Sequence, residues 1–407
     1  NTPSLVDLST AFAHMPRLRR MTLDIDVANV TNISNLAPCY ANEYPIVNPL
    51  EYVRFTRPFM EDVLEDVTDI FGMSPDSRPC GVLITESNFE DGVYNLIQTA
   101  LPTGMTHMCA DDNYFIATYD VKAEDIESGD PIPIFGDECP ALGDINTYVL
   151  GAQIPNYTFE YQFTEPSRYS VLVNWPNGVP SDINYMFGYC KTLVEVDFSH
   201  WSTAGVNDIS RMFEGCSGLS ELDVNNFDTS EVEYMNGMFA GCTGLQSMDL
   251  NNWDVTNLLE TNAMFSDCTN LTEVLLETWG SARPLDMQWM FANCISLTSD
   301  GISDMDTGGV AYFNGMYSGC INLQSVRIPS MEYAMECDEM FMGCEKLLDI
   351  VIGSPAPLNF QELSVADMFT DLPEEGTLSL ANYQAQEWET IKRALDDQAP
   401  TWTVESY

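Results

Sequence analysis

The stretch that decides the fold is residues 226–245, NFDTSEVEYMNGMFAGCTGL, because close copies of it recur along the second half of the chain. Its cysteine belongs to a series in which each member follows the last by 26 residues. The six members are Cys190, Cys216, Cys242, Cys268, Cys294 and Cys320. A fixed period of this size is typical of a solenoid, in which one small unit stacks on the next. The sequence therefore predicts a repeat array.

Each repeat contains two different periodicities. Val206, Ile209, Met212 and Cys216 are spaced by three or four residues, which predicts one face of a short helix. The following segment, residues 219–224, alternates apolar and polar positions and predicts a short strand. We therefore expect an α/β repeat solenoid with leucine-rich-repeat-like coils, each of one short strand and one short helix, with a period of about 26 residues.

The pattern in residues 226–245 resembles the BspA-like leucine-rich repeats, a type also described as a repeat of unknown function that is abundant in mycoplasma surface proteins. The resemblance covers residues 181–352, in several concordant copies. It implies the same solenoid fold, and a role in binding and adhesion at surfaces rather than in catalysis.

The regular repeats divide the chain into three parts. Residues 181–380 are expected to form the regular solenoid. Residues 1–180 contain weaker copies, marked by Cys39, Cys80, Cys109 and Cys139, and are expected to form irregular repeats with insertions. The alternative is a separate N-terminal domain that ends near a turn-rich segment before residue 180. Residues 381–407 are expected to form a C-terminal cap, with a helix over residues 383–397.

The chain has 12 cysteines, which could indicate disulfides. In the ladder of six, however, each thiol would have two equivalent neighbours and would point parallel to both, which disfavours a bridge. We expect these cysteines to be free, buried and small apolar side chains.

The charge is extreme, with 62 acidic and 15 basic residues and a net charge of −47. Such a field repels nucleic acid and anionic membranes, so neither is expected as a partner. The negative charge is typical of proteins in a saline environment, such as those of a halophile or a marine virus. The alternative is an acidic extracellular protein without adaptation to salt. No apolar run reaches 18 residues and no signal peptide is visible, so we expect no membrane insertion. The expected location is extracellular, at a cell or virion surface.

Catalytic motifs are missing from the sequence. The three histidines are isolated, and there is no Walker loop, nucleophile elbow or paired-cysteine zinc motif. We expect no enzyme activity, no catalytic residues and no cofactor. Bound Ca²⁺ is a weaker alternative, with the acidic turn residues Asp223, Asp228, Asp249 and Asp254 as oxygen ligands. Capping of turns by the same side chains explains them without an ion.

The outward face of the predicted strands is the candidate binding surface. Its residues are Glu195, Asp197, Glu221, Asp223, Asn225, Asp249, Asn251, Glu273 and Glu277. We expect this face or the loops to bind a glycan or a protein on another surface. The alternative function is structural, as a tail or capsid spike or decoration protein of a halophilic or marine virus that assembles with copies of itself.

Overall fold

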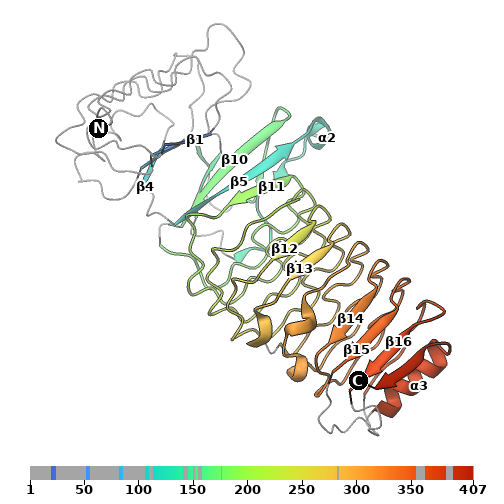
Figure 1. The fold of residues 1–407 in the computed structure, drawn as a ribbon. Coiled ribbons are helices and arrows are strands. Elements are labelled where there is room, and N and C mark those ends of the chain that lie inside the picture. The colour runs from blue at the N-terminus through green and yellow to red at the C-terminus, as the bar shows by residue number, and fades with distance from the viewer. Residues whose placement is uncertain are drawn as a thin grey trace, which may run out of the picture.

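The computed structural model describes residues 20–23, 52–55, 82–85, 106–109, 113–140, 145–149, 152–154, 158–175, 177–281, 284–353, 363–381 and 388–406. From residue 181 onward, successive turns of the chain lie side by side as a stack of coils (Figure 1). Parallel bridges join equivalent positions of neighbouring coils, from Asp182 with Asp208 through to Glu336 with Ser364. Equivalent residues in the 26-residue register are therefore neighbours in space.

Short parallel strands form part of one side of the stack. The pair β12 (Ser247–Asp249) and β13 (Glu273–Leu275) is parallel. A four-stranded parallel sheet follows, formed by β14 (Ser325–Ile328), β15 (Asp349–Ile352), β16 (Thr377–Leu380) and β17 (Thr403–Ser406). Residues 219–224, where the sequence predicts a strand, belong to no strand, although Leu219 and Val224 are buried as expected. Three short 3₁₀ helices complete this part: η2 (Trp279–Ser281), η3 (Ile302–Asp304) and η4 (Thr307–Gly309).

The prediction of one short helix in each coil is wrong. In place of a helix, residues 210–215 form consecutive tight turns, and the equivalent segments of the following coils do the same. The amides of Ile209, Arg211 and Phe213 donate to carbonyls of the next coil, whereas those of Met212 and Cys216 close turns within their own coil. Arg211 and Gly215 have left-handed backbones, with φ of 56° and 71°. In an α-helix the backbone amides donate within the helix, so they are not available for bonds between coils. An α-helix is also right-handed, whereas Arg211 and Gly215 have left-handed backbones.

The tight turns still bury the residues that the helical spacing selected. A column of stacked rings runs through the core, with one ring from each coil and centroids 5.4–6.1 Å apart. Its members are Phe187, Phe213, Phe239, Phe265, Phe291, Tyr317, Phe341 and Phe369. A second column places Phe227, Trp253 and Trp279 in register at 6.3 and 6.4 Å. Each coil therefore buries its apolar side chains against its neighbours.

The six ladder cysteines, Cys190 to Cys320, are buried and unbridged, and Cys344 extends the series. From Cys216 onward, each thiol donates to a backbone carbonyl of the preceding coil. The Cys242 Sγ lies 3.1 Å from the Phe213 oxygen, and the Cys268 Sγ lies 3.0 Å from the Phe239 oxygen. Burial raises the pKa of Cys268 to about 12, so this thiol is protonated at neutral pH. Cysteine thus supplies a small apolar side chain and a donor at one position.

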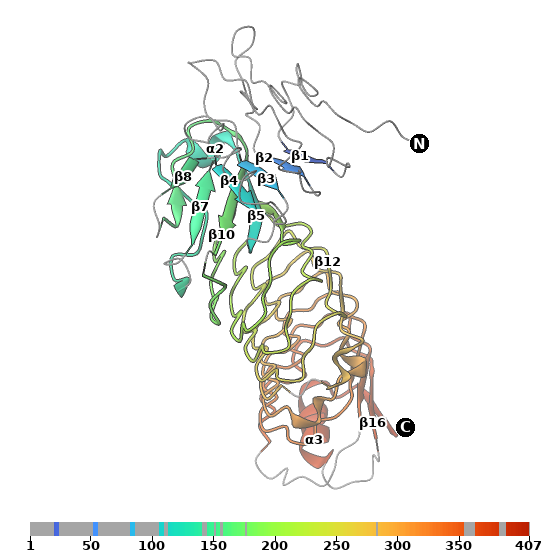
Figure 2. The same ribbon diagram turned by 90° about the vertical axis from the view of Figure 1, so that its left-hand side faces the viewer.

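Before the regular coils the topology changes. A parallel sheet in the order β1 (Arg20–Leu23), β2 (Tyr52–Phe55), β3 (Val82–Thr85), β4 (Thr106–Cys109) comes first. An antiparallel sheet follows, whose strands are β5 (Tyr114–Val121), β7 (Asn146–Val149), β8 (Ala152–Ile154), β10 (Ser167–Asn174) and β11 (Leu193–Asp197) (Figure 2). Two further elements are the helix α2 (Ala123–Ile126) and the pair of β6 (Ile132–Pro133) with β9 (Glu160–Tyr161).

The sequence predicts irregular repeats here, or a separate N-terminal domain, and the antiparallel sheet is part of neither prediction. One predicted copy does continue the ring column: Phe135 lies 6.1 Å from Phe187, and the Gly136 amide donates to the Met186 carbonyl. Cys39 and Cys80 lie outside the described residues. The choice between irregular repeats and a separate domain over residues 1–180 stays a prediction.

The C-terminal segment covers the last coil. The helix predicted over residues 383–397 is found as α3 (Glu389–Gln398), which buries Ile391, Ala394 and Leu395. The Gln398 side-chain oxygen accepts the Phe369 amide at 2.7 Å. In the preceding coils, such amides donate to a backbone carbonyl of the next coil. A side chain of α3 therefore satisfies a donor that the end of the stack would leave without a partner. Within the described residues, no helix is long and apolar enough to cross a membrane.

Tyr317 is the one residue of the ring column that carries a hydroxyl group, and this group reaches a half-buried carboxylate. It donates to Asp300 Oδ2 at 2.5 Å, while the Ile302 amide donates to Oδ1 at 3.1 Å. Burial raises the pKa of Asp300 above its ordinary value, and the hydrogen bonds from Tyr317 and Ile302 offset only part of this. Burial also raises the pKa of Tyr317, so its hydroxyl remains a donor.

Asp300→Asn is expected to stabilise the fold relative to the parent chain, increasingly as the pH rises. The raised pKa means that the folded state binds the Asp300 proton more tightly than the unfolded state does. The parent therefore loses stability as the pH rises from the ordinary carboxyl pKa through the raised value, and asparagine removes this loss. Urea unfolding of both proteins at several pH values measures the difference. A difference that is constant or shrinks with rising pH would contradict the expectation.

Candidate binding site

The structure spreads the predicted binding face over strands and turns. Glu195 and Asp197 lie on β11, Asp249 on β12 and Glu273 on β13, while Glu221, Asp223, Asn225, Asn251 and Glu277 lie in connecting segments. Asn251 is half-buried and the other eight are exposed. The rows along the stack are mixed, because Ser247 pairs with Glu273 and Asp249 pairs with Leu275. The face is therefore polar but not a continuous row of carboxylates.

Several of its carboxylates cap local turns. Asp223 Oδ1 accepts the Asn225 amide at 3.0 Å, and Asp249 Oδ1 accepts the Asn251 amide at 3.0 Å. Asp197 does the same for Ser199 at 2.9 Å. These are the side-chain to backbone bonds that short polar residues form in turns.

The four residues considered as Ca²⁺ ligands have the same role. Besides Asp223 and Asp249, Asp228 accepts the Ser230 amide and Asp254 accepts the Thr256 amide. The hydrogen bonds from the Thr256 side chain and amide lower the pKa of Asp254. In the part of the chain that the structure describes, no three histidine, cysteine, aspartate or glutamate side chains are grouped to hold a metal. The structure supports turn capping by these residues, and Ca²⁺ binding stays an untested alternative.

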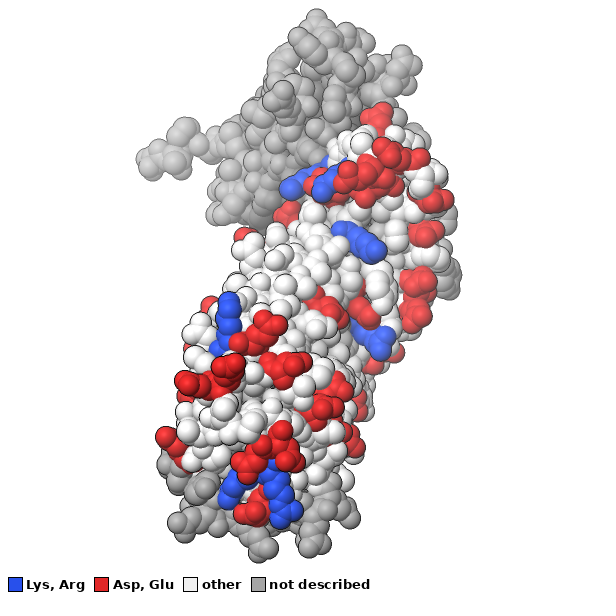
Figure 3. All heavy atoms as spheres, turned by 90° about the vertical axis from the view of Figure 1, so that its right-hand side faces the viewer, with Lys and Arg blue, Asp and Glu red and all other residues white. Residues whose placement is uncertain are grey.

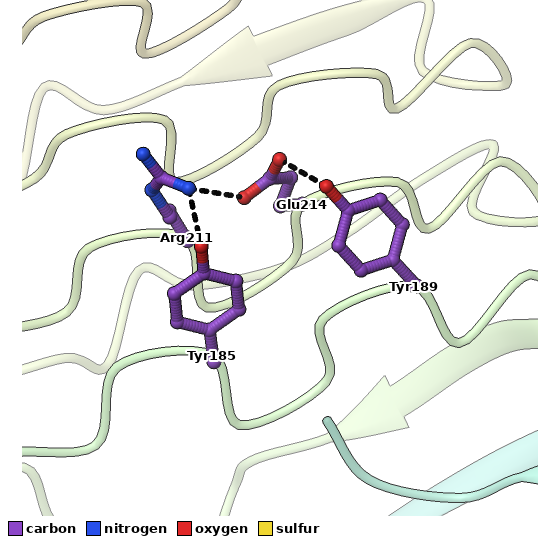
Figure 4. Close-up of polar contacts among 4 residues, drawn as sticks. All are labelled: Tyr185, Tyr189, Arg211 and Glu214. Carbon is purple, nitrogen blue, oxygen red and sulfur yellow. Dashed lines mark hydrogen bonds and ion pairs between the residues drawn. The ribbon is translucent and has the colours of Figure 1, made fainter. Parts of the chain in front are cut away.

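A different face carries a more specific arrangement, in the tight turns of the first two regular coils. We call Tyr185, Tyr189, Arg211 and Glu214 the turn-face cluster (Figure 4). The Tyr189 hydroxyl donates to Glu214 Oε1 at 2.6 Å, and Arg211 Nη1 lies 3.6 Å from Glu214 Oε2. The Arg211 guanidinium donates to the Tyr185 hydroxyl and lies 5.3 Å from the centre of the Tyr185 ring. The cluster thus holds two tyrosines, a cation and an anion in fixed contact on the surface.

The Tyr189 hydroxyl of the cluster is neutral at ordinary pH. The hydrogen bond to Glu214 raises the pKa of Tyr189 to about 12, and partial burial and the nearby negative charge add to the effect. Tyr189 nevertheless remains 51% exposed. It therefore offers an accessible ring together with a polar hydroxyl, a combination common in binding surfaces.

Tyr189 occupies a backbone position that is unfavourable for tyrosine. Its φ is 61°, in the left-handed region. At the equivalent position the following coils carry glycine, aspartate or asparagine: Gly215, Gly241, Asp267, Asn293, Gly319, Gly343 and Asp371. These are the residue types that tolerate the left-handed region, whereas a bulky side chain there costs about 1 kcal/mol. The other left-handed position of the coils does carry bulky residues, as at Arg211 and Trp289, so the strain alone does not single out Tyr189.

A hollow of about 440 Å³ adjoins Tyr189, between the antiparallel region and the first regular coil. Tyr189, Lys191 and Thr192 line one side of it. The other side comes from the segment that follows α2 and includes Asp130, with β6. The Thr192 Oγ1 is buried and makes no hydrogen bond within the described structure. Buried polar atoms normally have a partner, so this hydroxyl is an exception within the described residues.

The sequence pointed to neither the turn-face cluster nor the hollow. The sequence predicts a helix for this segment and selects its buried positions, whereas residues 185, 189, 211 and 214 are not among them. One signal was available, because Tyr189 breaks a column that is otherwise glycine, aspartate or asparagine. The hollow also needs the segment near Asp130, which belongs to the antiparallel region that the repeat pattern does not describe.

Comparison with known proteins agrees with the repeat region. A family described as Mycoplasma protein of unknown function, DUF285, matches residues 181–296 and 272–371. Residues 181–371 are similar to this family. Its description assigns no function, and the finer resemblance to BspA-like leucine-rich repeats stays a prediction. No curated protein matches the chain.

Proposed function

We propose that the chain is a non-enzymatic repeat solenoid that recognises a glycan or a protein on another surface through the turn-face cluster. The observation that carries the proposal is the exposed Tyr189 ring at a left-handed backbone position, fixed by Glu214 and beside a hollow. The exposed hydrogen bond to Glu214 contributes about 0–1 kcal/mol, which is comparable to the strain. A binding role explains why tyrosine stands there.

The charge distribution narrows the class of partner. Figure 3 shows acidic side chains over much of one face with few basic ones between them, and the net charge of the chain is −47. Nucleic acid and anionic membranes are repelled by such a field. Partners that are neutral or basic remain, and a protein displayed outside the cell or on a virion would meet them on another surface.

Tyr189→Asn is expected to weaken binding at least about tenfold, the loss typical of a central tyrosine in an interface. Asparagine tolerates the left-handed backbone and is present at the equivalent Asn293, so the fold should be kept. The measurement is binding of the purified chain to an array of immobilised glycans and extracellular matrix proteins.

The matched control is Tyr333→Asn, which removes a tyrosine that is also exposed but lies several coils away. It should bind as the parent does. Binding that Tyr189→Asn leaves unchanged, or that both variants weaken equally, would count against the turn-face cluster.

A second function, assembly with copies of the chain as in a virion spike or decoration protein, has one observation in its favour. Leu259, Leu285 and Met335 occupy one column of the stack and are 44%, 53% and 50% exposed. Their register follows from backbone bonds, since the Leu285 amide donates to the Leu259 carbonyl and the Met335 amide to Ala311. An exposed apolar stripe favours association. Repulsion between highly charged copies opposes it unless salt is high, so sedimentation at low and high salt distinguishes this function.

A further inference from the structure

We propose that the hollow beside Tyr189 binds an uncharged pyranose sugar. This inference rests on the proposed recognition function and names the chemistry of its ligand. The volume of about 440 Å³ lies within the range of small-molecule sites, roughly 300–1,000 Å³. A site of this size admits one or two sugar rings and leaves the rest of a glycan outside.

The walls of the hollow offer an apolar surface of the kind that a sugar ring needs. Pro131, Ile132 and Pro133 line the hollow together with Tyr189. A pyranose carries C–H groups on its ring faces, and these pack against the electron-rich face of an aromatic ring. Tyr189 is held by its hydrogen bond to Glu214, so little side-chain freedom is lost on binding.

The polar groups of the hollow are mixed, as the hydroxyls of a sugar require. The Asp130 carboxylate accepts hydrogen bonds and the Lys191 ammonium donates them. The Ser128 hydroxyl already accepts the Asp130 amide at 3.1 Å and can still donate. Each sugar hydroxyl both donates and accepts, so it can pair with any of these groups. Asp125 also lines the hollow, but its carboxylate already accepts the Lys122 amide at 2.8 Å.

The balance of charge favours a neutral sugar over an acidic one. Two carboxylates, Asp125 and Asp130, and one ammonium, Lys191, line the hollow. The field of the whole chain, at −47, adds to the repulsion of any anion. A cationic amino sugar would be attracted by the carboxylates but would lie against Lys191. The neutral ring is the ligand that uses both kinds of group.

Saturation-transfer NMR on the full chain tests the proposal with defined probes. These are the methyl glycosides of glucose, galactose, mannose and N-acetylglucosamine, with N-acetylneuraminic acid as the anionic comparison and glucosamine as the cationic one. At least one neutral glycoside is expected to receive saturation at its ring C–H protons. Tyr189→Asn and Asp130→Ala should each raise its dissociation constant about tenfold or more, because one removes the ring and the other a charged acceptor.

The matched control for Asp130→Ala is Glu127→Gln, which removes an exposed negative charge from the same segment but does not line the hollow. It should leave the dissociation constant unchanged. Absence of binding by every neutral glycoside, tighter binding of N-acetylneuraminic acid or glucosamine, or binding that survives both site variants would overturn the inference.

The two proposals can fail separately. If no neutral sugar binds but attachment to the array still depends on Tyr189, the sugar inference falls and the recognition function stands. If Tyr189→Asn changes neither measurement, both fall. Thermal unfolding of each variant, with a melting temperature close to that of the parent, shows that a loss of binding is not a loss of folding.

Discussion

Phe265→Ala is expected to lower the free energy of unfolding by about 4 kcal/mol. The Phe265 ring is fully buried in the middle of the ring column, 5.4 Å from Phe239 and 5.6 Å from Phe291. Its removal leaves a cavity that the neighbours cannot close, because the backbone on both sides is fixed by bonds between coils. The Phe239 amide donates to Met264, and the Phe265 amide donates to Met290. Chemical denaturation of the parent and variant measures the loss.

Phe265→Leu is the graded control for this prediction. It keeps most of the apolar volume and should cost less than half as much as alanine, about 1–2 kcal/mol. Tyr333→Asn, at an exposed position, should change stability by less than about 0.5 kcal/mol. A loss below about 1 kcal/mol for Phe265→Ala would mean that the column does not form the core.

The repeat pattern predicts the buried columns, because side chains that recur every 26 residues occupy equivalent places in successive coils. The cysteines, the ring that precedes each of them and the tryptophan column recur at 26 residues, and equivalent members are neighbours in space. A column of identical side chains is the arrangement that a stack of equal coils requires. These residues could therefore be assigned to the core before any backbone conformation was known.

The conformation of each coil could not be read in the same way. Spacings of three and four residues bury the same side chains in a helix and in consecutive tight turns. The difference lies in where the amides donate and in the left-handed residues. A glycine often precedes the ladder cysteine, as at Gly215 and Gly241, and this glycine is compatible with a helix end and with a tight turn. Hydrogen bonds between coils favour the tight turns over a helix. These bonds join different repeats, so the sequence of a single repeat does not reveal them.

The candidate binding site was beyond the reach of the pattern for a related reason. The repeat pattern consists of the residues that all coils have in common. Tyr189 and Arg211 occur only in the first coils, so they are not part of the pattern. The hollow also needs the segment near Asp130, which is brought to Tyr189 by the antiparallel strands. The predicted strand face was found exposed, but its aspartates are largely explained by turn capping.

The arrangement separates support from recognition. The core columns, with their stacked rings and thiol donors, repeat from coil to coil and hold the stack together. The turn-face cluster lies at one end of the regular coils, where the antiparallel region adjoins them. This division predicts that the number of coils in the middle of the stack can change without affecting the site.

The central claim is that each 26-residue unit is one coil, and a pair of deletions tests it most directly. Deleting residues 230–255 removes one full period and joins Thr229 to Thr256, which stands where Ser230 stood in the register. Phe213 then faces Phe265, and every column continues. Deleting residues 230–242 removes half a period and puts the coils after the deletion out of register with the coils before it.

Thermal unfolding followed by circular dichroism is the measurement. The full-period deletion is expected to unfold cooperatively, within about 10 °C of the parent, because a stack loses only one unit and one interface. The half-period deletion breaks the packing between the coils before and after it, so it is expected to melt more than about 10 °C below the full-period deletion or in two separate transitions. Equal behaviour of the two deletions would contradict the stack of 26-residue coils.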